Sequence, residues 1–180
     1  AISNVVPPLA PALRLFARRY LKLEPAFLGE AIRPAIPIRY QPPTAVGADR
    51  LADAVAVLRH YGAPAVVVDF GTATTFDAIS AGGEYLGGAI VPGMGVSLDA
   101  LFRTAAHLPR IELVRPARPI GGTTVESMQS GAYFGFVAQV EGMVTRFRRE
   151  LGEETRVIAT GGLAELIAAA TDCIHHVDPH

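Results

Sequence analysis

Residues 65–77 read Ala65-Val66-Val67-Val68-Asp69-Phe70-Gly71-Thr72-Ala73-Thr74-Thr75-Phe76-Asp77. The apolar run at the start predicts a buried strand over 65–69. Gly71, just past the strand end, lets the backbone turn sharply and approach a ligand. Threonine hydroxyls beside backbone N–H groups suit an anion such as phosphate. Asp69 repels phosphate but can bind a cation that phosphate also needs. The alternative is an ordinary strand followed by a turn.

Composition and charge limit the class of protein. The chain has 180 residues, half of them hydrophobic, and a net charge of −1, which is typical of a globular fold with a real core. The small net charge argues against a general electrostatic grip on nucleic acid or anionic membrane. No apolar run reaches the length of a membrane span, so we expect neither a nucleic-acid nor a membrane partner.

The expected location of the protein is the cytoplasm. The first residues lack the basic start and long apolar stretch of a signal peptide. The chain has one cysteine, Cys173, which excludes an internal disulfide and fits a reducing compartment.

Periodicity predicts a mixed α/β order of elements. We expect helices over 7–22, 48–61, 95–106, 124–151 and 163–170, and strands over 65–69, 74–80, 84–90 and 156–159. Gly82-Gly83 predicts a hairpin, which a pure doubly wound dinucleotide-binding fold does not need. Lys22 is the only lysine and lies outside any Walker A sequence, so phosphate chemistry needs another scaffold.

Two sets of residues predict how helices pack. The first expected helix has an apolar face formed by Leu9, Leu13, Phe16, Ala17 and Tyr20. Three glycines in the long helix, Gly131, Gly135 and Gly142, predict close approach to another element.

Other segments have both a structural and a functional interpretation. Asp49, in Gly47-Ala48-Asp49-Arg50, is either a helix cap or a base for a hydroxyl nucleophile, with Arg50 holding an anionic substrate. Residues 87–93, Gly-Gly-Ala-Ile-Val-Pro-Gly, are either a tight turn before a helix or a backbone wall against a ligand. Residues 121–124, Gly-Gly-Thr-Thr, either cap a helix or present a hydroxyl at its positive end.

The same choice applies near the end of the chain. Thr160-Gly161-Gly162 is either a helix entry turn or a surface for a nucleoside. The histidines of 175–180 are more often a frayed, solvated tail than a metal cluster.

Taken together, these segments resemble the type III pantothenate kinase family. The resemblance rests on five short motifs, at 46–50, 69–75, 87–93, 121–131 and 160–162, and extends over essentially the whole chain. It implies the α/β fold of the acetate/sugar kinase–Hsp70–actin superfamily. That fold has two ribonuclease-H-like halves, here 1–62 and 63–180, with the first half incomplete.

The resemblance also implies a reaction and an assembly. The family phosphorylates pantothenate with ATP, the first step of coenzyme A synthesis, and needs Mg²⁺ and a monovalent cation, K⁺ or NH₄⁺. It works as a homodimer with the pantothenate pocket at the subunit interface. Asp49 matches the proton acceptor and Asp69 the monovalent-cation ligand. The remaining matches are pantothenate contacts (Tyr40, Gly47, Ala48, Asp49, Arg50 and Thr124) and ATP contacts (Gly71, Thr72, Gly161 and Gly162).

The chain departs from the family pattern in several places. It lacks the initial strand ending in Asp-x-Gly-Asn-Thr and the helix expected after Asp178, so we expect a chain truncated at both ends, with uncovered sheet edges. Pro42 and Ala45 stand where Asn and Glu are usual, and Gly122-Thr123 where Lys-Asn is often found. Two other functions stay open: a non-catalytic regulatory or accessory protein on the same fold, and another sugar or acetate kinase.

Overall fold

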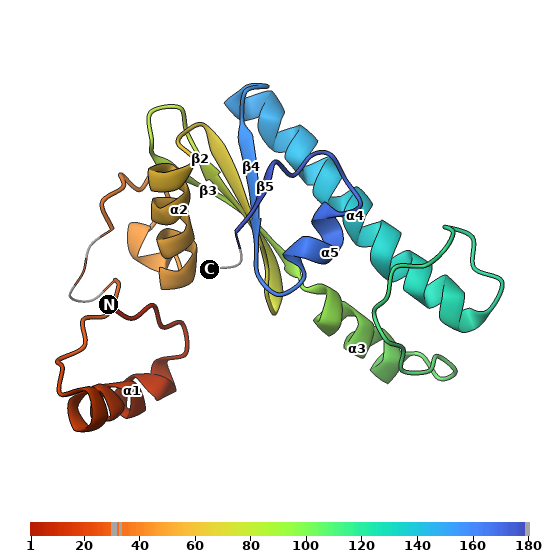
Figure 1. Ribbon diagram of the computed structural model, residues 1–180, viewed down its shortest axis with the longest axis horizontal. Helices are drawn as coiled ribbons and strands as arrows, with labels where there is room; N and C mark the ends of the chain where they lie inside the picture. Colours follow the sequence, from red (N-terminus) through yellow and green to blue (C-terminus); the bar gives the residue numbers. More distant parts are fainter. Residues whose placement is uncertain (30–31, 33, 179–180) are drawn as a thin grey trace.

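A five-stranded sheet forms the centre of the computed structural model, which describes residues 1–29, 32 and 34–178. The strand order is β3-β2-β1-β4-β5 (Figure 1). β1 (Ala65–Phe70), β2 (Ala73–Ile79) and β3 (Tyr85–Pro92) pair antiparallel, whereas β4 (Arg156–Thr160) pairs parallel to β1 and β5 (His176–Val177) parallel to β4. The expected hairpin is therefore confirmed, as is the mixed α/β class.

Helices cover both faces of this sheet. α2 (Ala48–His60) packs on one face, and α4 (Thr124–Leu151) and α5 (Ala164–Ala168) pack on the other (Figure 1). α3 (Met94–Thr104) follows β3, and the short turn η3 (Pro43–Ala45) precedes α2. No helix in the described part of the chain is both long and apolar enough to span a bilayer.

Alternation along β1 separates two hydrophobic clusters. Val66, Val68 and Phe70 join the cluster under α4, whereas Ala65 and Val67 join the cluster under α2. Because successive strand residues point to opposite faces, Asp69 lies on the α2 face. The α2 cluster also contains Ile36, Val46 and Leu51 together with Ile79 and Tyr85. Residues from both expected halves thus share one core, and the division at 62/63 stays a prediction.

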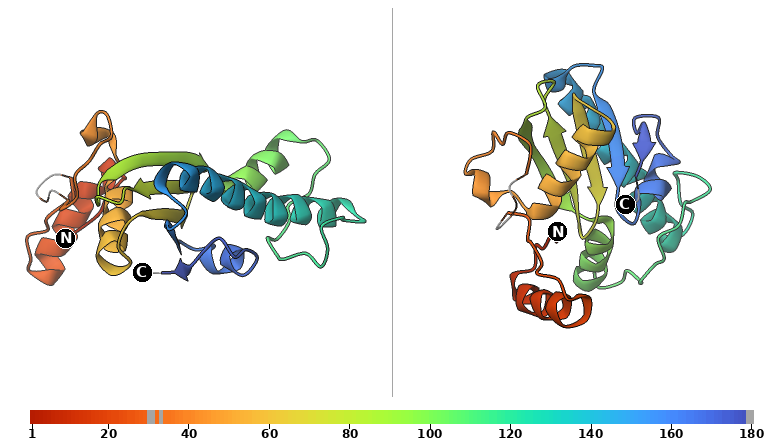
Figure 2. Two further views of the ribbon diagram at one scale, coloured as in Figure 1. Left: turned by 90° about the horizontal axis from the view of Figure 1, so that it is seen from above. Right: turned by 60° about the vertical axis from the view of Figure 1, so that its left-hand side comes forward.

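The first helical segment forms as expected but does not pack as expected. η1 (Pro7–Leu9), α1 (Ala10–Phe16) and η2 (Ala17–Leu21) follow one another and stand apart from the sheet (Figure 2). Of the expected apolar face only Ala17 is buried, while Leu9, Phe16 and Tyr20 are at least half exposed. The helical periodicity was sound, but the described residues supply no apolar surface to cover this face.

The expected close approach at the glycines of α4 is wrong. A Cβ added at Gly131 or Gly135 would meet nothing within 4 Å, and one at Gly142 would meet only Arg146 of the same helix. The buried stripe of α4 runs instead through residues such as Tyr133, Val137 and Val144, so the other face, with the glycines, is open.

His176 belongs to a strand, and the backbone around His175 is held by the same pairing rather than frayed. His176 and Val177 pair with Ile158 and Ala159, and the Val157 N–H donates to Nδ1 of His175 over 2.8 Å. No three His, Cys, Asp or Glu side chains gather as a metal site within residues 1–29, 32 and 34–178. Pro179 and His180 lie outside the described residues.

Candidate functional site

The first part of the site lies where β1 and β4 end side by side. Asp69 is the register partner of Thr160, so the loops that follow the two parallel strands meet at one edge of the sheet. Gly161 has φ +88°, and a Cβ there would lie 2.5 Å from Oδ1 of Asp69 and 2.8 Å from the backbone of Phe70. Only glycine fits this position. The structure thus brings together the predicted Asp69, Gly71, Thr72, Gly161 and Gly162.

The turn between β1 and β2 completes this edge. The Gly71 N–H donates to the Ala73 carbonyl, and the Gly93 N–H donates to the Thr72 carbonyl. Gly71, Thr72 and Gly162 are exposed, so a ligand can reach them. Residues 87–92 belong to β3, so the tight turn expected over 87–93 is wrong there, but Gly93 precedes α3 as expected. A Cβ on Gly93 would lie 2.4 Å from the Thr72 carbonyl oxygen. Close backbone approach accounts for this glycine.

The second part of the site is the start of α2. Gly47 is the N-cap residue, so Asp49 lies inside the helix, in its first turn. The Asp49 carboxylate is exposed, and its Oδ1 accepts the Arg50 backbone N–H over 2.8 Å. A Cβ on Gly47 would lie 2.4 Å from that oxygen. Glycine at this position therefore leaves room for the carboxylate.

Four aspartates lie on α2 or on the sheet face that α2 covers: Asp49 and Asp53 on α2, Asp69 on β1 and Asp77 on β2. Burial raises the pKa of Asp69, and the charges of Asp49 and Asp77 raise it further. Burial also raises the pKa of Asp53 to about 7, with added repulsion from Asp69, Asp77 and Asp49. Carboxylates that repel one another in a partly dry site favour a cation. A single enclosed carboxylate, Asp69, suits a weakly held monovalent ion, whereas Mg²⁺ usually keeps its waters and bridges phosphates.

Asp53→Asn should stabilise the protein at pH 8. The pKa of Asp53 is about 7 in the folded chain, against an ordinary 3.8. Between these values the unfolded state has lost a proton that the folded state keeps, so stability falls as pH rises from about 4 through about 7. Allowing for screening of a partly exposed group, we expect a gain of about 1 kcal/mol in the free energy of unfolding at pH 8 and little at pH 4.

Urea denaturation at the two pH values measures this effect. Asp172→Asn, at an exposed position, serves as the control that removes a charge without a buried environment. An equal gain at pH 4 and pH 8 would contradict the assignment to Asp53 ionisation.

A buried polar group links α2 to the sheet. The Arg50 guanidinium, expected to face an anionic substrate, pairs with Asp77 on β2, and the Tyr85 hydroxyl donates to the same carboxylate. A Cβ on Gly87 would lie 2.9 Å from the ring of the predicted Tyr40, so this ring packs on β3. Sequence reasoning missed Asp77 and Tyr85. Asp77 had a detectable signal, because a charged residue inside an apolar strand needs a buried partner.

Thr124 lies away from the other predicted residues. It is the first residue of α4, and this end of α4 is at the opposite side of the molecule from α2 (Figures 1 and 2). Thr123 is the N-cap, because its hydroxyl accepts the Glu126 N–H over 3.2 Å. The capping interpretation is therefore right for Thr123, and Thr124 follows it as an exposed residue.

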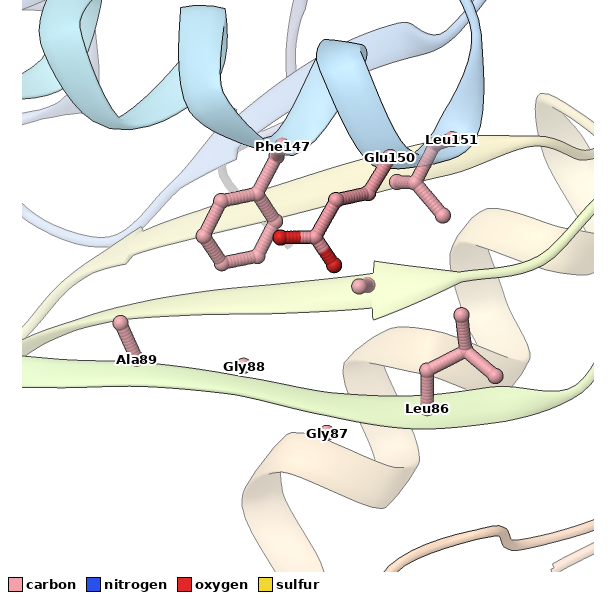
Figure 3. A pocket seen from close by; sticks show the side chains of 8 residues that line it. Leu86, Gly87, Gly88, Ala89, Phe147, Glu150 and Leu151 are labelled. Atoms are coloured by element: carbon pink, nitrogen blue, oxygen red, sulfur yellow. The ribbon is translucent and has the colours of Figure 1, made fainter.

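Two of the hollows outside this set of residues lie near β3 and α2. One, of about 280 Å³, lies between β3 and the end of α4, where the Glu150 and Phe147 side chains face the strand (Figure 3). It contains none of the predicted pantothenate, ATP or cation contacts, but Gly87, Gly88 and Ala89 of the 87–93 segment line it. The other, of about 570 Å³, is lined by apolar residues such as Ile36, Ile38, Val46 and Leu51, and Val46 directly precedes the loop that carries Asp49.

The mixed α/β fold is that of an actin-like kinase. The model of the family described as type III pantothenate kinase matches residues 1–146. The chain is 53% identical over 178 residues to the type III pantothenate kinase of Moorella thermoacetica, covering 99% of this chain and 70% of that one. It is 49% identical over 177 residues to the same enzyme of Myxococcus xanthus, covering 98% and 69%. The chain belongs to the type III pantothenate kinase family, a family of transferases.

A solved structure is also similar. A conserved Baf family protein of Campylobacter jejuni, described as a candidate transcriptional activator, aligns with a TM-score of 0.63 at 22% identity. The alignment covers 97% of this chain and 73% of that one. At this identity the likeness concerns the fold alone.

Proposed function

We propose that this protein transfers a phosphoryl group from ATP to pantothenate, giving 4'-phosphopantothenate in the first step of coenzyme A biosynthesis. The observation that carries the proposal is family membership at about half identity over nearly the whole chain. The geometry supports it, because an exposed carboxylate at the start of α2 lies within electrostatic reach of the Asp69 edge. The chain's half-buried Cys173 suits a cytoplasmic location, which we also propose.

Each part of the site has a role in this reaction. Phosphoryl transfer has a loose transition state, so the protein mainly positions groups and offsets charge. Asp49 accepts the proton of the primary alcohol. Because this proton leaves late in the reaction, a weak base such as a carboxylate suffices. Tyr40 and the Gly47–Arg50 loop hold pantothenate, whose carboxylate suits a guanidinium. Gly71, Thr72, Gly161 and Gly162 form the nucleotide side.

Cations complete the proposed site. Asp69 would hold K⁺ or NH₄⁺, because it is the enclosed carboxylate at the nucleotide edge and its repulsion from neighbouring aspartates needs relief. Mg²⁺ would be held mainly through the ATP phosphates. When bound, these ions supply positive charge against the negative charge of the transferring phosphoryl group.

The direct test is pantothenate-dependent ADP release by the full chain. We expect release in the presence of K⁺ and Mg²⁺, and much less when Na⁺ replaces K⁺. Absence of pantothenate-dependent ADP under these conditions would sink the proposal. No observation favours the regulatory alternative, since the likeness to the Campylobacter jejuni protein concerns the fold alone.

We also propose that the pantothenate pocket lies between two copies of the chain. Thr124 and Asp49 belong to opposite sides of one molecule, so one pantothenate can touch both only if a second copy supplies Thr124. A symmetric dimer with this arrangement would have two equivalent pockets.

Mixing two inactive variants tests the shared pocket. Asp49→Asn and Thr124→Val should each be impaired alone. After co-refolding in equal amounts, half the dimers are mixed and each has one intact pocket, so activity should return to about a quarter of the wild-type value. Activity no greater than the average of the two separate variants would contradict a shared pocket.

A further inference from the structure

The ion pair between α2 and β2 is unusually well buried. The side chains of Arg50 and Asp77 are 9% and 0% exposed. Oδ1 of Asp77 accepts Nε–H of Arg50 over 2.8 Å and the Tyr85 hydroxyl over 2.6 Å, while Oδ2 accepts the Thr75 hydroxyl over 3.1 Å. Both carboxylate oxygens are thus engaged, and the carboxylate has a fixed orientation.

Stability alone is a weak reason to keep such a pair. Desolvation of two charges offsets most of their attraction, and apolar side chains of similar volume often stabilise as well or better. Burial raises the pKa of Asp77, although hydrogen bonds from Tyr85, Arg50 and Thr75 act against this rise. The main effect of the pair is therefore to fix the position of the Arg50 side chain, rather than to add to the free energy of unfolding.

Arg50 retains unused donors. Its Nη2 lies 2.7 Å from Oδ1 of Asp77, but without hydrogen-bond geometry, so this buried nitrogen has no hydrogen-bond acceptor in the described part of the chain. A guanidinium has five N–H groups, and the Nε–H is the one that Asp77 holds in good geometry. Nη2 therefore keeps donor capacity that no residue in the described part of the chain uses.

The backbone of Arg50 connects this group to Asp49. The Arg50 N–H donates to Oδ1 of Asp49, while the Arg50 side chain is tied to the centre of β2. Asp77 on β2 therefore contacts the Arg50 side chain, and the Arg50 backbone contacts Asp49. A shift of the guanidinium would move the residue whose N–H orients the exposed carboxylate.

We propose that Asp77 is a positioning residue for phosphoryl transfer: with Tyr85 it fixes Arg50, which in turn orients Asp49 and presents its free N–H groups to the pantothenate carboxylate. This inference rests on the proposed function. It predicts that changes at Asp77 and Tyr85 impair the use of pantothenate. The use of ATP should be spared, because the proposed ATP site is at the ends of β1 and β4.

Asp77→Asn and Tyr85→Phe test the inference with a large and a small change to the buried group. Asparagine keeps the shape of Asp77 but removes the charge opposite Arg50, and we expect kcat/KM for pantothenate to fall about 10- to 100-fold because the substrate-positioning groups shift. Phenylalanine keeps the buried ring and removes only the hydroxyl, so we expect a fall of about 3- to 10-fold. KM for ATP should stay within about twofold for both variants.

Tyr61→Phe is the matched control. It also removes a hydroxyl that donates to an aspartate, here Asp178 over 3.1 Å, but outside this group. We expect unchanged kinetics for both substrates. If Asp77→Asn and Tyr85→Phe lower the melting temperature yet leave pantothenate kinetics unchanged, or alter both substrates equally, the positioning role is overturned.

Two further readouts separate the possible results. In the protein without substrate, the ¹⁵N-detected Nε–H of Arg50 should exchange slowly with solvent, and Asp77→Asn should abolish this protection; unchanged protection overturns the inference. The double variant Arg50→Lys/Asp77→Asn should be no worse than the more impaired single variant, since the residues act as a unit.

A wild-type chain that neither binds nor phosphorylates pantothenate overturns the proposed function along with this inference, whereas unaffected variants of an active chain overturn the inference alone.

Discussion

Asp49→Asn should lower kcat for pantothenate-dependent ADP release by about 10²- to 10⁴-fold, the usual contribution of a general base. In the proposed reaction the exposed Asp49 carboxylate at the start of α2 takes the alcohol proton. Asparagine keeps its shape and can still accept the Arg50 N–H, so pantothenate binding should change little. Steady-state kinetics and calorimetric titration with pantothenate measure the two effects separately.

Asp99→Asn provides the control for this variant. Asp99 is on α3 and pairs with Arg103 at the surface, so its replacement should leave kcat unchanged. If Asp49→Asn kept wild-type kcat, Asp49 would not be the base. If it lost binding as completely as turnover, its role would be in holding substrate.

Asp69→Asn should remove the dependence of activity on K⁺ and raise KM for ATP at least about tenfold, because a neutral amide is a weaker cation ligand than a carboxylate. Oδ1 and Oδ2 of Asp69 lie close to Gly161 and Gly71 respectively, so the amide fits the same enclosure. Activity measured against K⁺ concentration, with ATP varied at each step, gives both quantities.

Thermal unfolding distinguishes this loss from misfolding. Since burial and neighbouring charges raise the pKa of Asp69, its ionised form opposes folding at neutral pH when no cation is bound. The Asn variant without ligand should therefore melt no lower than the wild type. A variant that still requires K⁺ would show that the cation binds elsewhere.

Much of the fold could be predicted from sequence because its signals are local. The long helix was expected over 124–151 and is observed over Thr124–Leu151, since Thr123 caps its start and Gly152 ends it. Gly83, with φ +74°, makes the turn of the expected hairpin. β5 has no detectable strand pattern in the sequence, because it has two residues and one of them is an exposed histidine. Backbone pairing with β4 creates the strand.

Part of the site could also be predicted, because some of its residues have local signals in the sequence. Asp69 and Gly161 were expected at strand ends, and parallel pairing of β1 and β4 brings them together. Asp53 and Tyr85 gave no local signal, because their importance depends on which aspartates gather across α2 and β2. The packing of α1 was misjudged because an amphipathic pattern indicates a face to be covered but not what covers it.

The parallel pairing of β1 with β4 also determines when a nascent chain acquires its site. β1, β2 and β3 are neighbours in sequence and can pair as soon as they leave the ribosome. The edge of the sheet at Asp69, however, is incomplete until Gly161 is present, and Gly161 is synthesised only after the whole of α4. Long-range parallel pairing of this kind forms late, so the cation site proposed at Asp69 would be complete only at the end of folding.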